Sequence, residues 1–378
     1  MDALMLPLPK DWEIKTFRDI STINQGLQIP ISQRLKAPTE HAKFYITIQA
    51  LNNRKEFEYI KTYNESVVCH KDDILMTRTG NTGMVITNIE GVFHNNFFKI
   101  NFDRTLINKD FLVYFLSLEQ TQKTILKKAG TSTIPDLNHN DFYSLLIPLP
   151  PLNEQIAIAN ILSGLDHYLY TLDALILKKE SVKKALSFEL LSQRKRLKGF
   201  NQAWQRVRLG DICEITTGSL DANEMVHYGK YRFYTCAKEY YFIDKYAFDT
   251  EAILISGNGA YVGYVHYYKG KFNAYQRTYV LDNFSEHIIF IKYFLKMFLQ
   301  SHIQTNRNEG NTPYIVMATL KDFEIPLPPL NEQSAIADIL SALDKEIESL
   351  KNKKRQFDNI KKALNHDLMS TKIRVLKK

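Results

Sequence analysis

The residues that could carry out catalysis in this chain of 378 residues form no complete catalytic motif. The stretch "NTPY" at 311–314 approaches the [N/D/S]PP[Y/F/W] motif of amino-methyltransferases, but Thr312 stands in place of the first proline and no FxGxG cofactor loop occurs. The stretch "SGNGAYVG" at 256–263 is one residue out for a GxGxxG dinucleotide loop, and no helix pattern follows it. We therefore predict a turn at each place and a chain that is not an enzyme.

Metal and nucleotide sites are also missing from the sequence pattern. Cys69, Cys213 and Cys236 are odd in number, far apart and without a CxxC pair, which argues against a structural zinc and a disulfide framework. No GxxxxGK[S/T] loop occurs, and the one ExK triplet, at 13–15, precedes every Pro-Asp pair, so the PD…(D/E)xK order of many nucleases is absent. We predict no metal and no cofactor on this chain, and free, buried thiols.

Polar loops carry the side chains that could contact DNA. Arg and Lys bind phosphate or guanine, and Asn and Gln can read adenine in the major groove. The formal net charge of +8 and the pI near 9.0 fit a polyanionic partner, and they fit an ordinary soluble basic protein as well. The stretch from Tyr228 to Phe248 interleaves cations with aromatic residues, which suits either phosphate contact or an aromatic β core. The DNA-binding candidates are Gln28, Arg34, Arg78, Asn81, Lys127, Lys128, Thr131, Ser132, Lys230, Arg232, Asn258, Gln276, Arg277, Arg307, Asn311 and Thr312.

An internal repeat organises the chain. The nine residues "IPLPPLNEQ" occur at 147–155 and again at 325–333, and a weaker echo pairs "WEIKTFRDISTINQG" from Trp12 with "WQRVRLGDICEITTG" from Trp204. The copied segments therefore bracket two bodies, at 1–150 and 200–328, whose own sequences differ. We predict two mixed α/β domains related by an approximate two-fold axis, each followed by a helical segment, at 151–199 and 329–378.

Each helical segment carries apolar residues at alternating steps of four and three, which is the heptad pattern of a coiled coil. The pattern predicts two helices of about 40 residues. Because the first helix leaves body one and the second leaves body two, the pair must be antiparallel to pack together. The apolar seam comprises Ile158, Leu162, Leu165, Leu169, Leu172, Ile176, Leu186 and Leu190, and then Ile336, Leu340, Leu343, Ile347, Leu350, Phe357, Leu364 and Leu368.

Shorter elements are predicted inside the bodies. The segment "DDILMTRTGNTGMV" indicates a strand, a turn and a strand, and "EAILISGNGAYVGYV" does so in body two. One helix is expected over "NKDFLVYFLSLEQTQKTILKKAG", ending at Gly130, and another over "SEHIIFIKYFLKMFLQSHI". Lys292 and Lys296 interrupt the most apolar run, so we expect no membrane span and a cytoplasmic protein.

With its duplicated bodies, the paired PLPPLNEQ motifs and the heptad tails, the chain resembles the specificity (S) subunit of type I restriction-modification systems. The resemblance implies two target recognition domains joined by two long helices packed as an antiparallel coiled coil. It implies a non-catalytic reader of double-stranded DNA, in which each domain reads one half of a bipartite, asymmetric target and the helices set the gap.

The same resemblance implies two modification (methyltransferase) subunits and restriction/translocase subunits as partners, with S-adenosylmethionine, ATP and magnesium on those partners. It places partner contacts at Pro150, Leu152, Glu154, Gln155, Pro328, Leu330, Glu332 and Gln333. Two alternatives stay open: a stand-alone DNA methyltransferase or restriction enzyme, and a coiled-coil scaffold that binds only proteins.

Overall fold

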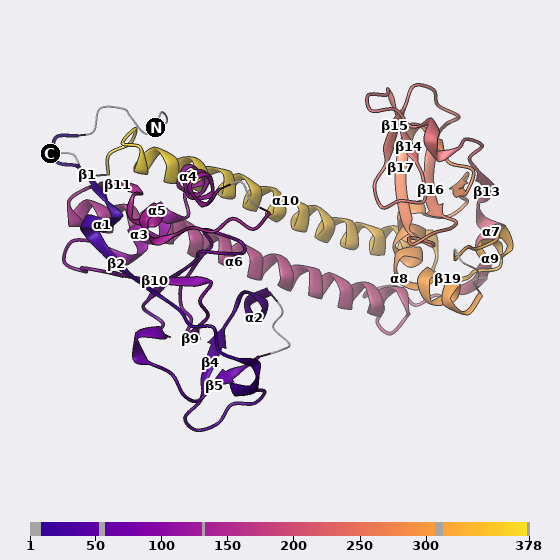
Figure 1. Ribbon diagram of the computed structural model, residues 1–378. Helices are drawn as coiled ribbons and strands as arrows, with labels where there is room; N and C mark the ends of the chain where they lie inside the picture. Colours follow the sequence, from indigo (N-terminus) through magenta and orange to yellow (C-terminus); the bar gives the residue numbers. More distant parts are fainter. Residues whose placement is uncertain (1–8, 53–56, 131–132, 307–312, 376–378) are drawn as a thin grey trace. The chain divides into compact units, whose positions relative to one another are not determined.

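The computed structural model describes residues 9–52, 57–130, 133–306 and 313–375 (Figure 1). The chain divides into two compact units: unit 1 is Met1–Asp173 with Asn352–Lys378, and unit 2 is Ala174–Lys351. The two predicted long helices are α6 (Leu152–Leu191) and α10 (Leu330–Met369), each of 40 residues. The division falls inside both of them, so each unit contains a part of α6 and a part of α10.

Unit 1 contains two larger sheets and a separate strand pair. The larger sheets have the orders β2-β10-β7-β8 and β3-β5-β4-β9-β6, and β1 pairs with β11. The strands are β1 (Glu13–Thr16), β2 (Ser21–Gln25), β3 (Arg34–Leu35), β4 (Lys43–Ile46), β5 (Tyr59–Ile60), β6 (Val68–Cys69), β7 (Ile74–Thr77), β8 (Val85–Ile86), β9 (Gly91–Phe93), β10 (Phe97–Phe102) and β11 (Leu146–Leu149). The shorter helices are α1 (Phe17–Ile20), α2 (Ile48–Asn52), α3 (Lys109–Leu116), α4 (Glu119–Ala129) and α5 (His139–Tyr143).

Unit 2 has one six-stranded sheet of order β13-β18-β16-β17-β14-β15 and the strand pair β12-β19. Helix α8 packs against β16 and β17 (Figure 1). The strands are β12 (Gln205–Arg208), β13 (Glu214–Thr217), β14 (Tyr231–Tyr234), β15 (Tyr241–Ile243), β16 (Phe248–Ser256), β17 (Val265–Ala274), β18 (Thr278–Asp282) and β19 (Glu324–Leu327). The helices are α7 (Leu209–Ile212), α8 (Ile288–Asn306) and α9 (Met317–Lys321).

The two units share a strand order and differ in how the second hairpin strand is formed. The order β2-β10-β7-β8 corresponds to β13-β18-β16-β17, and in both units a central antiparallel hairpin carries the glycine turn. In unit 2 the second hairpin strand, β17, pairs with both β16 and β14. In unit 1 the corresponding run is broken at Asn88, which has φ 57°, and two short strands, β8 and β9, share those pairings.

One predicted helix is two helices. The segment after Asn108, whose side chain accepts a hydrogen bond from the Phe111 amide, forms α3 and then α4. Leu118 separates them because its backbone is extended (φ −63°, ψ 134°). The predicted end of the segment at Gly130 is confirmed, and Gly130 has φ 90°. The prediction of a single helix here is therefore wrong, whereas α8 in unit 2 runs without a break.

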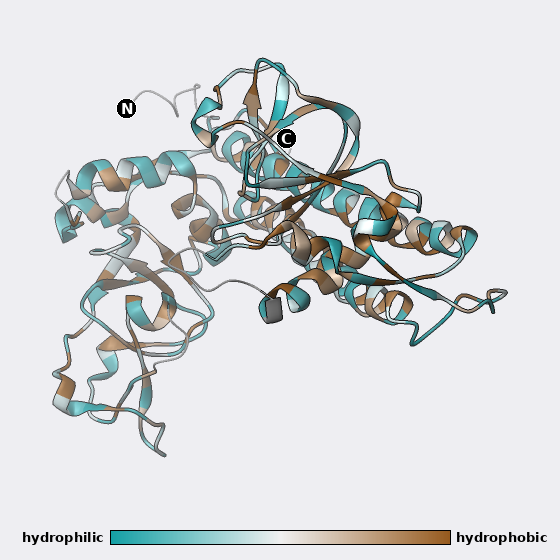
Figure 2. Ribbon diagram, turned by 90° about the vertical axis from the view of Figure 1, so that its right-hand side faces the viewer, coloured by the Kyte–Doolittle hydropathy of each residue, from teal (hydrophilic) through white to brown (hydrophobic). Residues whose placement is uncertain are grey.

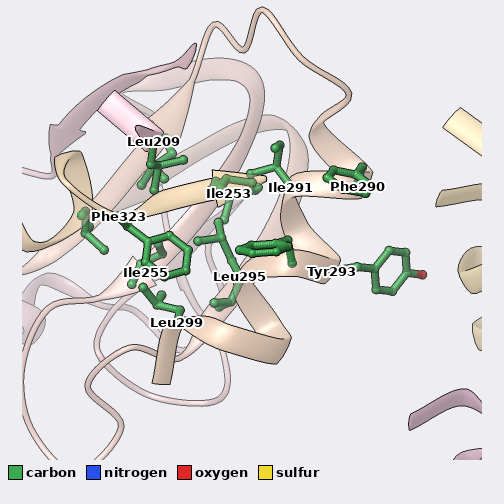
Figure 3. Close-up of a cluster of buried hydrophobic side chains, with 14 of the residues drawn as sticks. Leu209, Ile253, Ile255, Phe290, Ile291, Tyr293, Leu295, Leu299 and Phe323 are labelled. Carbon is green, nitrogen blue, oxygen red and sulfur yellow. The ribbon is translucent and has the colours of Figure 1, made fainter. Parts of the chain in front are cut away.

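Each unit has its own hydrophobic core, and the long helices contribute to both cores. In unit 2 the strand residues Ile253 and Ile255 pack against Phe290, Leu295 and other residues of α8 (Figure 3). Ile336 and Leu340 of α10 belong to this core. Ile158 and Leu162 of α6 have the same place in the core of unit 1.

Within each unit the long helices are antiparallel neighbours. In unit 1, Lys361 forms an ion pair with Asp166, and Lys354 Nζ lies 2.8 Å from Asp173 Oδ1. Residue numbers thus decrease along α10 in the direction in which they increase along α6, so the two helices are antiparallel. In unit 2, Lys351 pairs with Glu180 at 2.6 Å, and Lys183 pairs with Asp344. The ribbon of these helices alternates between apolar and polar residues (Figure 2). The seam residues with less than a tenth of their surface exposed are Ile158, Leu162, Leu169, Leu172, Ile176, Leu190, Ile336, Leu340, Ile347 and Leu368.

Candidate nucleic-acid interface

Backbone hydrogen bonds hold four turns of unit 2 together. The Gly257 amide donates to the Arg277 carbonyl (2.8 Å), the Gly259 amide to Pro313 (2.9 Å), and the Gln276 amide to Leu220 (2.9 Å). A Cβ on Gly257 would lie 2.3 Å from the Arg277 carbonyl oxygen, so only glycine allows this approach. We call residues 218–221, 257–264, 275–277 and 313–314 loop cluster 2.

Loop cluster 2 presents cations, amides and aromatic rings to solvent. Gln276 and Arg277 are exposed at its tip, and Asn258 forms a β-bridge to Tyr314. Tyr261 and Tyr314 have 43% and 38% of their surface exposed. These groups can stack on bases and donate hydrogen bonds to base edges or phosphates. The structure thus brings together Asn258, Gln276 and Arg277 from the predicted set.

The sequence predictions omitted the tyrosines of this cluster. Tyr261 lies beneath the ammonium group of Lys238, which is 5.0 Å from its ring centre, and Tyr264 packs on His266. Their signal in the sequence was the "AYVGY" alternation beside the glycine turn, which could equally indicate a buried strand. The glycine turn itself is confirmed, with Gly259 and Gly263 at φ 81° and 80°.

The aromatic stretch of unit 2 contributes to a β core, and its cations lie beside tyrosine rings or at the surface. Phe233 and Tyr234 are buried, as an aromatic core requires. Arg232 directly precedes them on the chain, and its guanidinium stands 4.2 Å from the ring centre of Tyr240 and 4.5 Å from that of Tyr268. Arg232 is therefore half-buried among tyrosines, whereas Lys230, just before β14, is exposed.

Unit 1 has an equivalent set of joined turns. The Leu137 amide donates to the Arg78 carbonyl (2.9 Å), Thr82 Oγ1 to the Pro135 carbonyl (2.6 Å), and Arg78 Nη2 to Asp136 Oδ2 (2.6 Å). The bridge from Thr79 to Asp136 has the place that Asn258 and Tyr314 have in unit 2. We call residues 77–84, 94–96 and 133–137 loop cluster 1.

The predicted DNA-binding residues of unit 1 differ in solvent exposure and in their hydrogen bonds within the chain. Asn81 is exposed at the tip of loop cluster 1, and Lys127 is exposed near the end of α4, whose Ala129 carbonyl accepts from the Asp136 amide (3.1 Å). Lys128 donates to Ser144 Oγ (2.8 Å), and Gln28 is exposed on a separate turn.

Two predicted arginines of unit 1 are bound within the unit. Arg34 donates to the Ile29 carbonyl and pairs with Glu58 (3.0 Å), and Arg78 pairs with Asp136, which leaves their side chains 17% and 19% exposed. Both arginines hold turns in place, and this is their evident role in the isolated chain. The predicted residues Thr131, Ser132, Arg307, Asn311 and Thr312 lie outside the described residues.

The repeated motif builds a buried clamp at the start of each long helix. In unit 2, Arg196 and Trp204 both donate to the carboxylate of Glu332, at 2.6 and 3.2 Å. In unit 1, Arg374 and Trp12 donate to Glu154, at 2.7 and 3.1 Å. We call these sets start clamp 2 and start clamp 1. The hydrogen bond from each arginine to its glutamate raises the arginine pKa further above its ordinary value.

The neighbouring glutamine of each motif ties the helix to its own unit. Gln155 accepts from the Asn108 amide (2.9 Å) and donates to the Pro150 carbonyl (2.8 Å). Gln333 accepts from the His287 amide (3.0 Å) and donates to the Pro328 carbonyl (2.8 Å). The repeated letters thus encode the junction of body and helix.

The structure places most of the predicted partner-contact residues in the interior of their own unit. The side chains of six of the eight residues are enclosed by their own unit, because each contributes to the clamp or to the proline approach. Only Leu152 and Leu330 reach the surface, and Leu330 is 56% exposed. The six enclosed residues are Pro150, Glu154, Gln155, Pro328, Glu332 and Gln333.

The structure also bears on metal sites, cysteines and membrane-spanning helices. Within the described ranges, no group of three or more His, Cys, Asp or Glu residues is placed to hold a metal ion. The cysteines are free, as predicted, but only Cys69 is fully buried. No helix in the described portion has the length and apolarity that crossing a membrane requires.

Comparison with known proteins agrees with this repeated geometry. The sequence profile of the family described as "Type I restriction modification DNA specificity domain" matches residues 9–179 and 201–357. The type I restriction enzyme EcoDI specificity subunit of Escherichia coli is 38% identical over 170 residues, which span 44% of this chain and 37% of that protein. The MjaVIII specificity subunit of Methanocaldococcus jannaschii is 25% identical over 98% of this chain and 95% of its own length.

A solved structure has the same fold. The S subunit of a type I restriction-modification system from M. genitalium superposes with a TM-score of 0.66 at 19% identity, covering 98% of this chain and 99% of that one. The resemblance seen in the sequence is therefore confirmed. The chain belongs to the type I restriction-modification DNA specificity family, and it carries the domain of that family twice.

Proposed function

We propose that this chain is the DNA-specificity subunit of a type I restriction-modification complex, and that each loop cluster reads one half of a bipartite target. One observation carries the proposal: two joined sets of turns rest on the same framework yet present different side chains. Asn258, Gln276 and Arg277 in unit 2 have counterparts of other types in unit 1. Unlike readers on a common framework give a target whose two halves differ in sequence.

The proposed target is double-stranded DNA, and the chain itself performs no chemistry. Methylation of a base inside a duplex requires that the base be flipped into an active site, so a separate protein can hold the register on DNA. Two modification subunits with S-adenosylmethionine would supply that active site. Restriction/translocase subunits would supply ATP- and magnesium-dependent steps.

The decisive experiment exchanges one reader. The segment from Phe17 to Leu145 is replaced by that of a relative with a different target, and the complex is reconstituted with modification subunits. Methylated sites are then mapped on random-sequence duplexes. One half of the target should change and the other should stay. A change in both halves, or in neither, contradicts the assignment of one reader to each unit.

We also propose that the two long helices set the length of the unread gap. Deleting residues 169–175 of α6 together with 352–358 of α10 removes about 10 Å from each helix and keeps the heptad register. The mapped gap should become shorter while both half-sites stay the same. An unchanged gap would refute this spacing role. Deleting residues 169–175 alone is the control, since it puts the seam out of register.

The alternative of a stand-alone enzyme can be tested with the purified chain. The purified chain without partners, given duplex DNA with S-adenosylmethionine or with magnesium, should show no methyl transfer and no cleavage. Turnover by the isolated chain would favour that alternative. A reconstituted complex that discriminates no DNA sequence would favour the protein-binding scaffold.

A further inference from the structure

Three helices of unit 2 line an open pocket of about 360 Å³ that belongs to neither loop cluster 2 nor start clamp 2. Met297 and Ile347 give it an apolar wall. Its charged lining comes from α6, α8 and α10, and comprises Glu180, Lys183, Lys184, Lys296, Asp344 and Lys351. Cations from three separate helices therefore face one hollow.

The positive charges in this pocket outnumber the negative ones. Lys183 forms an ion pair with Asp344, and Lys351 Nζ lies 2.6 Å from Glu180 Oε1. Tyr293 Oη also donates to Asp344 (2.6 Å), so that carboxylate is fully engaged. Among the described residues, neither Lys184 nor Lys296 forms an ion pair. Neither ammonium group thus has an acid in direct contact; burial lowers the pKa of Lys296, and the charge of Asp344 acts in the opposite direction.

The pKa of the neighbouring Lys292 is consistent with the excess of positive charge in this pocket. Lys292 lies one turn before Lys296 on α8, and its ammonium stands 4.3 Å from the ring centre of Tyr293. Burial, together with the charges of Lys296 and Lys183, lowers the pKa of Lys292 to about 8, although Asp344 acts in the opposite direction. The pocket is therefore a place where one more positive charge is unfavourable and a negative charge is favourable.

The excess belongs to unit 2 and is not a property of the repeat. Lys183 and Lys184 recur in unit 1 as Lys361 and Lys362, 178 positions on. Tyr114 donates to Asp166 as Tyr293 donates to Asp344. Counted from these tyrosines, however, Ser117 stands where unit 2 has Lys296. The repeat preserves the framework of the pocket, and unit 2 alone adds the extra cation on α8.

We propose that this pocket binds a phosphate group. Lysine ammonium groups are compact point charges that bind phosphate from several directions, and a hollow of this volume admits a phosphate with part of the molecule that carries it. The phosphate has two sources in the proposed setting: a free phosphate or nucleotide, or the backbone of a DNA duplex. The inference goes beyond the reading of DNA sequence, because the pocket lies outside the loop clusters.

The test compares two variants of the full chain with equal charge. Lys184→Gln with Lys296→Ser removes the two unpaired cations and leaves both ion pairs in place. Lys178→Gln with Lys345→Ser removes two exposed cations that do not line the pocket. Thermal unfolding is followed against inorganic phosphate, against ATP without magnesium, and against a duplex without the target sequence, with chloride added to equal ionic strength.

Phosphate or ATP should raise the Tm of the parent chain and of the control variant. In the pocket variant the apparent Kd should rise about tenfold or more, because two charge-assisted contacts are lost. If the duplex alone shows this difference between the variants, the source is the DNA backbone. Equal responses of both variants to all three probes would overturn the proposal.

A second readout guards against a change in folding. Reductive ¹³C-methylation of the lysines allows the Lys292 amine to be titrated by NMR, with Lys292→Arg identifying its signal. Saturating phosphate should move this titration to higher pH in the parent chain and should leave it unmoved in the pocket variant. An unmoved titration in the parent chain counts against binding at this place, whatever the Tm shows.

Discussion

Arg196 donates two hydrogen bonds to Glu332, whose side chain is completely buried in unit 2. Replacing Arg196 with Ala leaves this buried carboxylate without its cation, which destabilises the folded state. Urea unfolding should therefore show a lower midpoint. The control is Arg206→Ala, since Arg206 pairs with Glu324 on the surface and such pairs contribute less than about 1 kcal/mol. Equal effects of the two changes would contradict the clamp.

The ionisation of Asp344 should make the free energy of unfolding vary with pH in acidic solution. Burial raises its pKa, but hydrogen bonds from Lys183 and Tyr293 outweigh burial and hold the pKa below its ordinary value. A carboxylate with a depressed folded pKa stabilises the fold above its unfolded pKa, near 3.8, and this contribution is lost as pH falls through the folded pKa. Asp344→Asn should be less stable at pH 7 by at most about 1 kcal/mol, because the carboxylate is partly exposed to solvent, and the difference should narrow below pH 4.

The comparison for this change is Asp338→Asn, because Asp338 is exposed on the same helix. Its free energy of unfolding should stay within about 0.5 kcal/mol of the parent at each pH. A difference for Asp344→Asn that is constant from pH 7 to pH 3 would show that the stabilisation does not come from ionisation.

Gly257 should be required for reading by unit 2. A methyl group there meets the Arg277 carbonyl oxygen at 2.3 Å and the Tyr279 ring at 2.9 Å, so the turn bearing Gln276 and Arg277 must move. Gly257→Ala should weaken discrimination at one half-site about tenfold, as loss of a bidentate contact does, and leave the other half-site unchanged. Methylation of paired half-site libraries measures this. Gly164→Ala on α6, with nothing within 4 Å of the added carbon, should change neither half-site.

The three thiols should react in a fixed order. Burial raises the pKa of Cys69 and of Cys213 to about 12, so almost no thiolate is present at pH 8. Cys236 is half-buried beside loop cluster 2, where its Sγ lies 3.2 Å from the Arg277 carbonyl oxygen. Iodoacetamide at pH 8 should label Cys236 first, and a target duplex should slow this labelling. Mass spectrometry of the native protein gives the answer, and first labelling at Cys69 would contradict it.

The long helices and the glycine turns could be predicted because they depend on residues at regular spacing in the sequence. Heptads fix the length and the buried face of a helix, so residues such as Leu162 and Leu340 could be placed in the seam from sequence alone. Chain order then required antiparallel packing, and the ion pair of Lys361 with Asp166 agrees. Glycine turns were also legible, since Gly259 and Gly263 need positive φ.

The clamps were beyond the reach of such patterns. The family resemblance placed partner contacts at the repeated letters, yet within this chain Glu154 and Glu332 are buried by arginines 220 and 136 positions away. Pairing over such distances leaves no local signal. The break between α3 and α4 was likewise not predictable, because Leu118 is an ordinary helix former, although its backbone is extended and its side chain is buried.

Each buried glutamate takes its arginine from the residues that follow the other long helix: Arg196 follows α6 and joins Glu332, and Arg374 follows α10 and joins Glu154. Unit 2 is one continuous stretch, whereas unit 1 needs residues 352–375 as well as its first 173. On the ribosome, unit 2 can therefore close its clamp while unit 1 still waits for residues not yet made. The half that is translated first is the half that is finished last.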